Sequence, residues 1–188
     1  KKLIFTISFL ILIFPGILFS GVLNGITAYS VSNVVAAGDA GLIMRSNTSG
    51  ISWQELNFPG EDFKSISFAG NKILTGTGSG KLFIFSTNDS LSLLYSFSPQ
   101  FTINSIFFIN SAKGFLCGSN GFIYKTDNGG INWSLINSGI GSVNLNSILF
   151  ITETNGFAAG NGGRIFFTSD AGLNWISETS NTQSDILK

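Results

Sequence analysis

The chain has no histidine and a single cysteine, and each scarcity removes a class of function. Without histidine it lacks the commonest general base near neutral pH and the commonest transition-metal ligand, which excludes histidine-dependent triads and zinc sites. Cys117 cannot form an intrachain disulfide, and its apolar surroundings, GFLCGS, predict a buried strand residue rather than a reactive thiol. The sequence therefore predicts no metal and no cofactor.

Net charge is also absent, because 10 basic and 10 acidic residues cancel among the 188 of the chain. A chain without a net field does not attract nucleic acid or an anionic surface over long range. We therefore expect no nucleic-acid partner. The length suffices for one domain with a real hydrophobic core.

Residues 1–20, KKLIFTISFLILIFPGILFS, have the layout of a secretory signal peptide. Two lysines precede an apolar run from Leu3 to Phe14, which Pro15 breaks, and Ser20 is suited to precede a cleavage site. The apolar run is short of the roughly 20 residues that span a bilayer. The alternative is a retained membrane anchor, because the uncharged stretch continues to Gly38. We expect an exported chain that touches a membrane only through this segment, if it stays uncleaved.

Beyond residue 22 the chain repeats itself. Leu23, Phe63, Ile103 and Leu145 share one register at spacings of 40, 40 and 42, and further columns begin at Ile26, Gly38, Ser46 and Trp53. A period of about 40 residues built from short β-type segments is typical of a four-stranded β-propeller blade. We therefore predict an all-β fold with blades over residues 23–62, 63–102, 103–144 and 145–186, and a fifth blade starting at 187.

The number of repeats predicts an incomplete ring. Propellers close with about 4–8 blades, so that no blade keeps an uncovered apolar face. We expect the four blades to form an arc whose first and fourth members are apart. We also expect the parent protein to continue with further repeats.

Three equivalent turns end in tryptophan: SNTSGISW (46–53), TDNGGINW (126–133) and TSDAGLNW (168–175). Hydroxyl and carboxylate groups can bond the backbone of a tight turn, glycine adopts conformations closed to other residues, and tryptophan buries a large apolar area. We expect a structural role for Ser46, Thr48, Gly50, Trp53, Thr126, Asp127, Gly130, Trp133, Thr168, Asp170, Gly172 and Trp175. The alternative, a calcium or sugar site at Asp127 and Asp170, offers one carboxylate per turn, whereas calcium takes 6–8 oxygens.

The turn TSDAGLNW resembles the Asp-box, or bacterial neuraminidase repeat, with its pattern S/T-x-D-x-G-x-T/N-W. The stretch GFLCGSNGFIYKTDNGGINW is similar to the repeat of the photosystem II assembly and stability factor family and its secreted bacterial relatives. The resemblance covers residues 23–188. Several positions depart from the pattern: Thr48 replaces the box Asp, Asp127 lies one place early with Asn128 at the box position, and the second repeat has Ser90 for Gly and Leu93 for Trp.

Propellers bind ligands on the face that carries the loops from second to third strand and from outer strand to next blade. The first loop class contributes Asp39, Ser119, Asn120, Asn161 and Arg164, and the second contributes Glu61, Asp62, Gln100 and Asn137. Most of these side chains are small and neutral. A glycosidase needs two opposed carboxylates, which Asp39 could form with Glu61 or Asp62. The alternative is that these acids are solvated loop charges.

The family resemblance implies a chaperone-like scaffold that acts through a basic patch. This chain has only two arginines, Arg45 and Arg164, and does not show that patch. Resemblance to sialidases would imply an arginine cluster, an Asp acid/base and a Tyr–Glu nucleophile pair, but the FRIP-like segment is missing. We therefore expect a non-catalytic exported propeller that binds a protein or a glycan. The alternative is a sialidase-like glycoside hydrolase.

Overall fold

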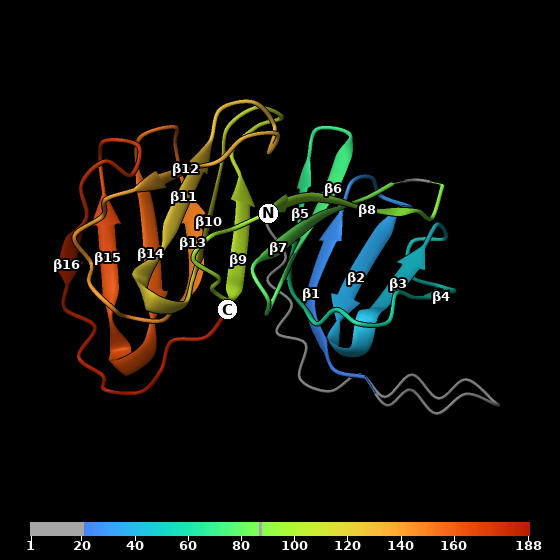
Figure 1. The fold of residues 1–188 in the computed structure, drawn as a ribbon, viewed down its shortest axis with the longest axis horizontal. Coiled ribbons are helices and arrows are strands. Elements are labelled where there is room, and N and C mark those ends of the chain that lie inside the picture. Colours follow the sequence, from blue (N-terminus) through green and yellow to red (C-terminus); the bar gives the residue numbers. More distant parts are fainter. Residues whose placement is uncertain (1–20, 87) are drawn as a thin grey trace.

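Each repeat of the sequence builds one antiparallel sheet, which we call a blade (Figure 1). The computed structural model describes residues 21–86 and 88–188, so the predicted signal peptide lies outside the described residues. Blade 1 holds β1 (Leu23–Ala28), β2 (Val34–Gly38), β3 (Leu42–Ser46) and β4 (Gln54–Asn57). Blade 2 holds β5 (Phe63–Ala69), β6 (Lys72–Thr77), β7 (Lys81–Phe85) and β8 (Leu91–Ser96).

Blades 3 and 4 follow the same order. Blade 3 holds β9 (Ile103–Phe108), β10 (Gly114–Gly118), β11 (Ile123–Thr126) and β12 (Ser134–Ile136). Blade 4 holds β13 (Leu145–Phe150), β14 (Gly156–Gly160), β15 (Ile165–Thr168) and β16 (Ile176–Glu178). Blades 1 and 4 lie at opposite ends of the molecule in Figure 1. The prediction of an all-β, partial propeller of four four-stranded repeats is confirmed.

Three buried clusters each lie between two consecutive blades, and a fourth, of Ala36, Leu42 and Met44, comes from blade 1 alone. Val35 and Ile43 of blade 1 pack with Phe63 of blade 2, and equivalent clusters join blade 2 to blade 3 and blade 3 to blade 4. In the cluster between blades 3 and 4 the rings of Phe115 and Phe150 stack at 3.9 Å. A blade between two others therefore buries both faces, which explains the many phenylalanines of the blades. Within the described segments, no helix is long and apolar enough to cross a membrane.

Blade 2 departs by one residue from the register that the sequence columns predict. Thr77 pairs with Phe63 in the way that Gly38 pairs with Leu23 and Gly118 with Ile103, so Thr77, and not Gly78, occupies the end of the second strand. At this position two segments of the backbone approach closely, since a Cβ on Gly118 would lie 1.7 Å from the carbonyl oxygen of Thr102.

The three tryptophan turns (46–53, 126–133 and 168–175) share one set of hydrogen bonds. In the third, Thr168 Oγ1 accepts the N–H of Gly172 at 3.0 Å, Asp170 Oδ1 accepts the N–H of Asn174 at 2.9 Å, and Trp175 donates to the carbonyl of Gly172 at 3.0 Å. The bond from the Asn174 backbone is the main cause that lowers the pKa of Asp170 below its ordinary value. Equivalent bonds run through Ser46, Thr48, Gly50, Ser52 and Trp53, and through Thr126, Asn128, Gly130, Asn132 and Trp133.

The second tryptophan turn corrects one predicted residue. Asn128 Oδ1, and not the carboxylate of Asp127, accepts the N–H of Asn132 at 2.9 Å. Asp127 is exposed, and its carboxylate lies 3.4 Å from Lys125 Nζ. The side chain two places after the hydroxyl residue holds the turn, because that spacing alone brings its oxygen to the backbone of the returning strand.

Replacing Trp133 with alanine should destabilise the protein by about 3–5 kcal/mol, the usual cost of truncating a large buried aromatic residue. Trp133 is 6% exposed and makes edge contacts with Phe97 and Phe108. Urea unfolding measures the effect. The matched control is Ile131→Ala in the same turn, where the side chain is 54% exposed and the expected change is below about 0.5 kcal/mol. Equal unfolding midpoints for the two variants would contradict this role for the tryptophan.

Candidate functional site

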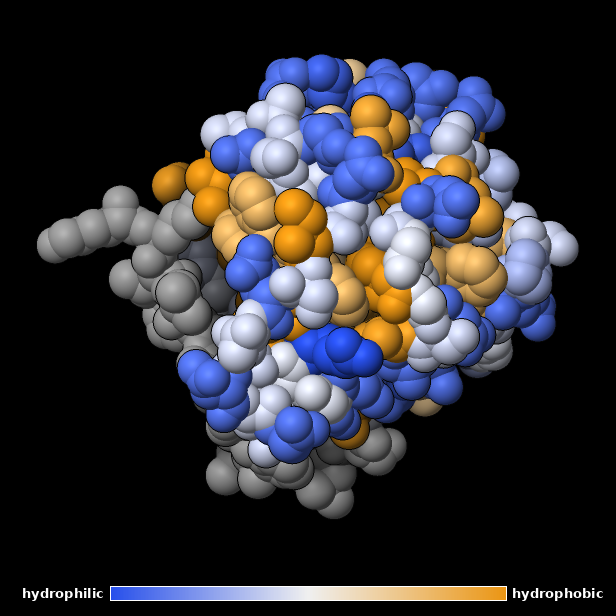
Figure 2. All heavy atoms as spheres, turned by 90° about the vertical axis from the view of Figure 1, so that its left-hand side faces the viewer, coloured by the Kyte–Doolittle hydropathy of each residue, from blue (hydrophilic) through white to orange (hydrophobic). Residues whose placement is uncertain are grey.

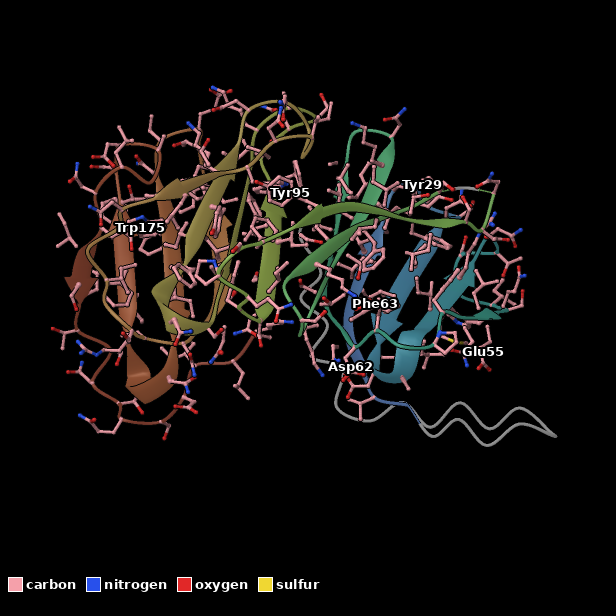
Figure 3. The ribbon with its side chains drawn as sticks, in the orientation of Figure 1. Tyr29, Glu55, Asp62, Phe63, Tyr95 and Trp175 are labelled. Atoms are coloured by element: carbon pink, nitrogen blue, oxygen red, sulfur yellow. The ribbon has the colours of Figure 1, made fainter. Side chains whose placement is uncertain are left out.

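The loops at one end of the strands form what we call the rim, and they are of two kinds. One kind joins the second and third strands of a blade, and three of these loops are short 3-10 turns, η1 (Asp39–Gly41), η2 (Ser119–Gly121) and η3 (Asn161–Gly163). The other kind joins the outer strand of a blade to the inner strand of the next. Figure 3 shows Asp62 at this end of the molecule, and Tyr29 at the opposite end with the tryptophan turns. All predicted ligand-face residues lie on the rim.

Asp62 connects two blades across the rim. Its Oδ1 accepts the backbone N–H of Ala40 in η1 at 2.9 Å, although Asp62 itself precedes the inner strand of blade 2. Asn144 does the same for Asn120, at 3.1 Å, and Asp185 for Gly162, at 2.8 Å. The three receiving residues all have positive φ, a conformation that leaves their N–H pointing away from the turn. Asp62 and Asn120 are thus parts of structural clamps between blades.

Asp39 lies at the centre of a small polar network. Its Oδ1 accepts hydrogen bonds from Lys64 Nζ at 2.5 Å and from Asn24 Nδ2 at 2.6 Å. Partial burial raises the pKa of Asp39, but the hydrogen bonds from Lys64 and Asn24 and the charge of Lys64 outweigh it and hold that pKa below the ordinary value. Asp39 is therefore an ionised, paired carboxylate and is unsuited to act as a general acid near neutral pH.

Glu61 and Asn161 are also occupied by neighbours within the protein. Glu61 forms an ion pair with Lys81 and accepts a hydrogen bond from Ser79 Oγ at 3.2 Å. Asn161 Oδ1 accepts a hydrogen bond from Asn146 Nδ2 at 2.9 Å. The candidate carboxylates for a glycosidase pair are Asp39, Glu61 and Asp62. Each is thus bonded to a lysine or to a backbone amide.

Arg164 is the rim residue that differs from the others. It opens β15 beside a hollow of about 490 Å³. Among residues 21–86 and 88–188, no carboxylate lies within ion-pair distance of its guanidinium. The hollow is lined by backbone, hydroxyl and amide groups together with one acid: Gly162, Gly163, Ser177, Glu178, Thr179, Ser180, Asn181, Thr182 and Gln183.

The arrangement favours binding over hydrolysis. Glycoside hydrolysis needs one carboxyl group with a raised pKa and a second, free carboxylate facing it. Asp39, Glu61 and Asp62 are instead each bonded to a lysine or to a backbone amide, whereas Arg164 offers donors that match a carboxylate in geometry and charge. Across the described part of the chain, no three Cys, Asp or Glu side chains gather in a way that could hold a metal ion.

Sequence reasoning missed a column of asparagines on the inner strands. Asn24 Nδ2 donates to the carbonyl of Phe63 at 2.8 Å, and Asn104 Nδ2 donates to the carbonyl of Leu145, also at 2.8 Å, so each side chain ties its blade to the next. Asn146 makes the corresponding bond to Ile186 at 3.0 Å. The signal was present in the sequence, because each asparagine directly follows a residue of the first repeat column, apart from Lys64 in blade 2.

The last residues of the chain continue this pattern. The N–H of Ile186 donates to the carbonyl of Gly160 at 3.1 Å, so Ile186 stands where Phe63 and Leu145 stand in earlier repeats, one residue before the predicted Leu187. Lys188 Nζ then reaches the carbonyl oxygens of Asn24 and Lys64 on the inner strands of blades 1 and 2. Burial there lowers the pKa of Lys188.

Comparison with solved structures gives the fold. The chain is similar to "YCF48 bound to D1 peptide" (TM-score 0.59, 12% identity, 90% of this chain and 86% of that chain) and to YCF48 from Cyanidioschyzon merolae (0.70, 16%, 94% and 62%). It is also similar to an ancestral GH74 enzyme (0.67, 21%, 81% and 23%). The chain thus spans less than two thirds of the last two. No family model and no curated protein matches it. These likenesses show a β-propeller resembling YCF48.

Acid should remove the contribution of Asp39 to stability. Its pKa is lowered on folding, so the stabilisation is present above the unfolded-state value of about 3.9 and is lost as pH falls through the folded-state value. Wild type should therefore unfold at higher urea than Asp39→Asn at pH 7, and the gap between the two midpoints should shrink as pH falls below the unfolded-state pKa and Asp39 takes up a proton. A gap that stays the same size as the pH is lowered would contradict this prediction.

Proposed function

We propose that this chain is a non-catalytic, exported propeller that binds a protein partner through its rim, as an assembly factor does. The observation that carries the proposal is that Arg164 lies in a polar hollow with no carboxylate within ion-pair distance, whereas the rim acids Asp39 and Glu61 are paired with lysines. The likeness to YCF48, which has been solved bound to a D1 peptide, supports a peptide as the kind of ligand.

The chemistry of the hollow indicates an acidic peptide segment. A guanidinium holds a carboxylate with two parallel hydrogen bonds. The hydroxyl and amide groups of Ser177, Ser180 and Asn181 can bond the polar backbone of an extended peptide. Glu178 lies in the same hollow and disfavours a second acidic group beside the first.

The N-terminal layout supports export. Two lysines followed by an apolar run and a helix-breaking proline are typical of secretory signals, and the single cysteine fits a mature chain that uses no disulfide. The tryptophan turns have the spacing of Asp-boxes, and on this proposal they serve the fold alone.

Glycoside hydrolysis is the second candidate, because the likeness to an ancestral GH74 enzyme also covers most of this chain. The paired states of Asp39 and Glu61 weigh against it. Incubation with xyloglucan, cellulose oligosaccharides and sialosides decides the matter, since release of reducing sugar by wild type but not by Asp39→Asn would replace the binding proposal.

Arg164→Gln should weaken binding of acidic peptides by about tenfold or more, the loss expected for a charge-assisted hydrogen-bonding group. The probe is an array of acidic peptides, each beside a version in which Glu and Asp are replaced by Gln and Asn. The matched control is Lys72→Gln, which also removes one positive charge. Lys72 begins β6, on the side of the molecule opposite the rim. Equal binding by the two variants, or no preference of wild type for the acidic versions, would sink the proposal.

A further inference from the structure

The loops at the end of the strands opposite the rim form a second surface, which we call the turn face. It holds, in each blade, the turn between the first two strands and the turn between the last two. Backbone hydrogen bonds join these two turns: Ser49 N–H to the carbonyl of Ser32 at 3.0 Å in blade 1, Gly129 to Ala112 at 2.8 Å in blade 3, and Ala171 to Thr154 at 2.9 Å in blade 4. Both turns of these blades therefore have fixed positions on the turn face.

Five turns of the turn face each present one exposed aliphatic side chain, and we call these side chains the tips. They are Val31, Ile51, Ile131, Ile151 and Leu173, and they are between 54% and 91% exposed. Four of them are among the five most exposed large hydrophobic residues of the described chain. Figure 2 views the molecule from the side of blade 4, and hydrophobic side chains stand among hydrophilic ones at its top, where the turns lie. Single apolar side chains are common on protein surfaces, but the tips are concentrated at one end of the blades.

Three of the tips occupy one equivalent position. Ile51, Ile131 and Leu173 each lie two residues before the tryptophan of their turn. The indole of that tryptophan donates a hydrogen bond to the carbonyl of the glycine directly before the tip, at 2.9–3.1 Å. The equivalent turn of blade 2, STNDS (86–90), has no tryptophan and no aliphatic residue. The tryptophan turns therefore hold their tips in a fixed direction, so little conformational entropy is lost when the tips bind something.

The exposure of the tips does not depend on the place of a blade in the arc. Neighbouring blades pack through the faces of their sheets, and the buried clusters between them contain no tip. Blade 3 has a neighbour on each side, yet its tip Ile131 is 54% exposed. A blade packed beside blade 4 would cover the face of that sheet and leave the turns uncovered.

The charged groups of the turn face compensate one another. Three pairs of opposite charge lie on it: Arg45 with Asp89, Lys113 with Glu153, and Lys125 with Asp127. The carboxylate of Asp170 is bonded within its own turn, to the backbone and the side-chain amide of Asn174. A surface of this kind is neither strongly attracted nor strongly repelled by a charged partner. It suits an electrically neutral partner.

We propose that the turn face docks on a zwitterionic lipid bilayer, with the tips inserted below the headgroups. A protein interface is built around a contiguous apolar core, whereas the tips lie in separate turns with hydroxyl and amide residues between them. A fluid bilayer can close around each tip separately, and the binding strength then grows with the apolar area that is buried. The sequence alone predicts membrane contact only through residues 1–20. In this arrangement the rim points away from the membrane, so the inference stands apart from the proposed peptide binding.

An environment-sensitive fluorophore on the full chain tests the proposal. It is attached at Asn132→Cys, beside the tip Ile131, or at Asn137→Cys on the rim. Both positions are exposed, whereas Cys117 is buried and does not react. With phosphatidylcholine vesicles, we expect the emission of the label at residue 132 to move to shorter wavelength and that of the label at residue 137 to stay unchanged. The shift should persist in about 0.5 M salt, because insertion of the tips is not electrostatic.

The variant Ile51→Ser with Leu173→Ser removes two tips and should lower the docking constant roughly tenfold or more. Most of the shift at residue 132 should then be lost at the lipid concentration that half-saturates the unsubstituted protein. The matched control is Val22→Ser with Leu187→Ser, which removes two aliphatic side chains of similar exposure at the rim end and should leave the shift unchanged. The proposal is overturned by the absence of a shift at residue 132, by a shift at residue 137 instead, or by a shift that needs phosphatidylserine and disappears in salt.

Discussion

The structure depends on one constraint, which is that a four-stranded blade with two apolar faces needs a neighbour on each side. A single repeat unit cannot bury its own hydrophobic faces and needs stacked neighbours to be stable. The three clusters between consecutive blades supply the burial, and their residues recur at each junction, from Val35 and Phe63 to Phe115 and Phe150. The uniform period of the sequence follows, because each blade must fit the one before it and the one after it.

The same constraint determines which polar groups of the rim are used in contacts between blades. The tight turns at the ends of the strands have backbone N–H groups without strand partners, and buried or half-buried donors of this kind must be satisfied. Asp62, Asn144 and Asp185 meet that need. Two further acids, Asp39 and Glu61, form ion pairs with Lys64 and Lys81. Most rim polarity is thus used to hold the arc together.

The repeat and its strands could be predicted from the sequence because one hydrophobic column, one glycine column and one tryptophan column all agree on the spacing. The displacement in blade 2 could not, since Gly78 and Ser86 fit the spacing although Thr77 and Phe85 end the strands. Spacing also predicts nearly all the residues that hold the tryptophan turns. The exception is Asn128, which takes the role expected of Asp127.

The roles of the rim residues could not be read from the sequence, because composition does not say which neighbour a carboxylate meets. Asp62 resembles a free loop charge until the backbone of Ala40 is placed beside it. The same holds for Arg164, which differs from the other rim residues in having no carboxylate within ion-pair distance in the described chain. Strand register, which spacing alone does not give, also brings Leu149, Phe157, Phe167 and Ile176 onto one face of blade 4.

The clamps between blades also order events in time for a chain that emerges from a ribosome or a translocation channel with its N-terminus first. The turn η1 of blade 1 stays incomplete until Asp62 has emerged, and η2 of blade 3 waits for Asn144. Blades 1 and 3 are therefore finished only by residues that precede the inner strand of the next blade. Maturation proceeds in one direction along the chain, and a pause in synthesis just before residue 62 or residue 144 would hold the preceding blade open.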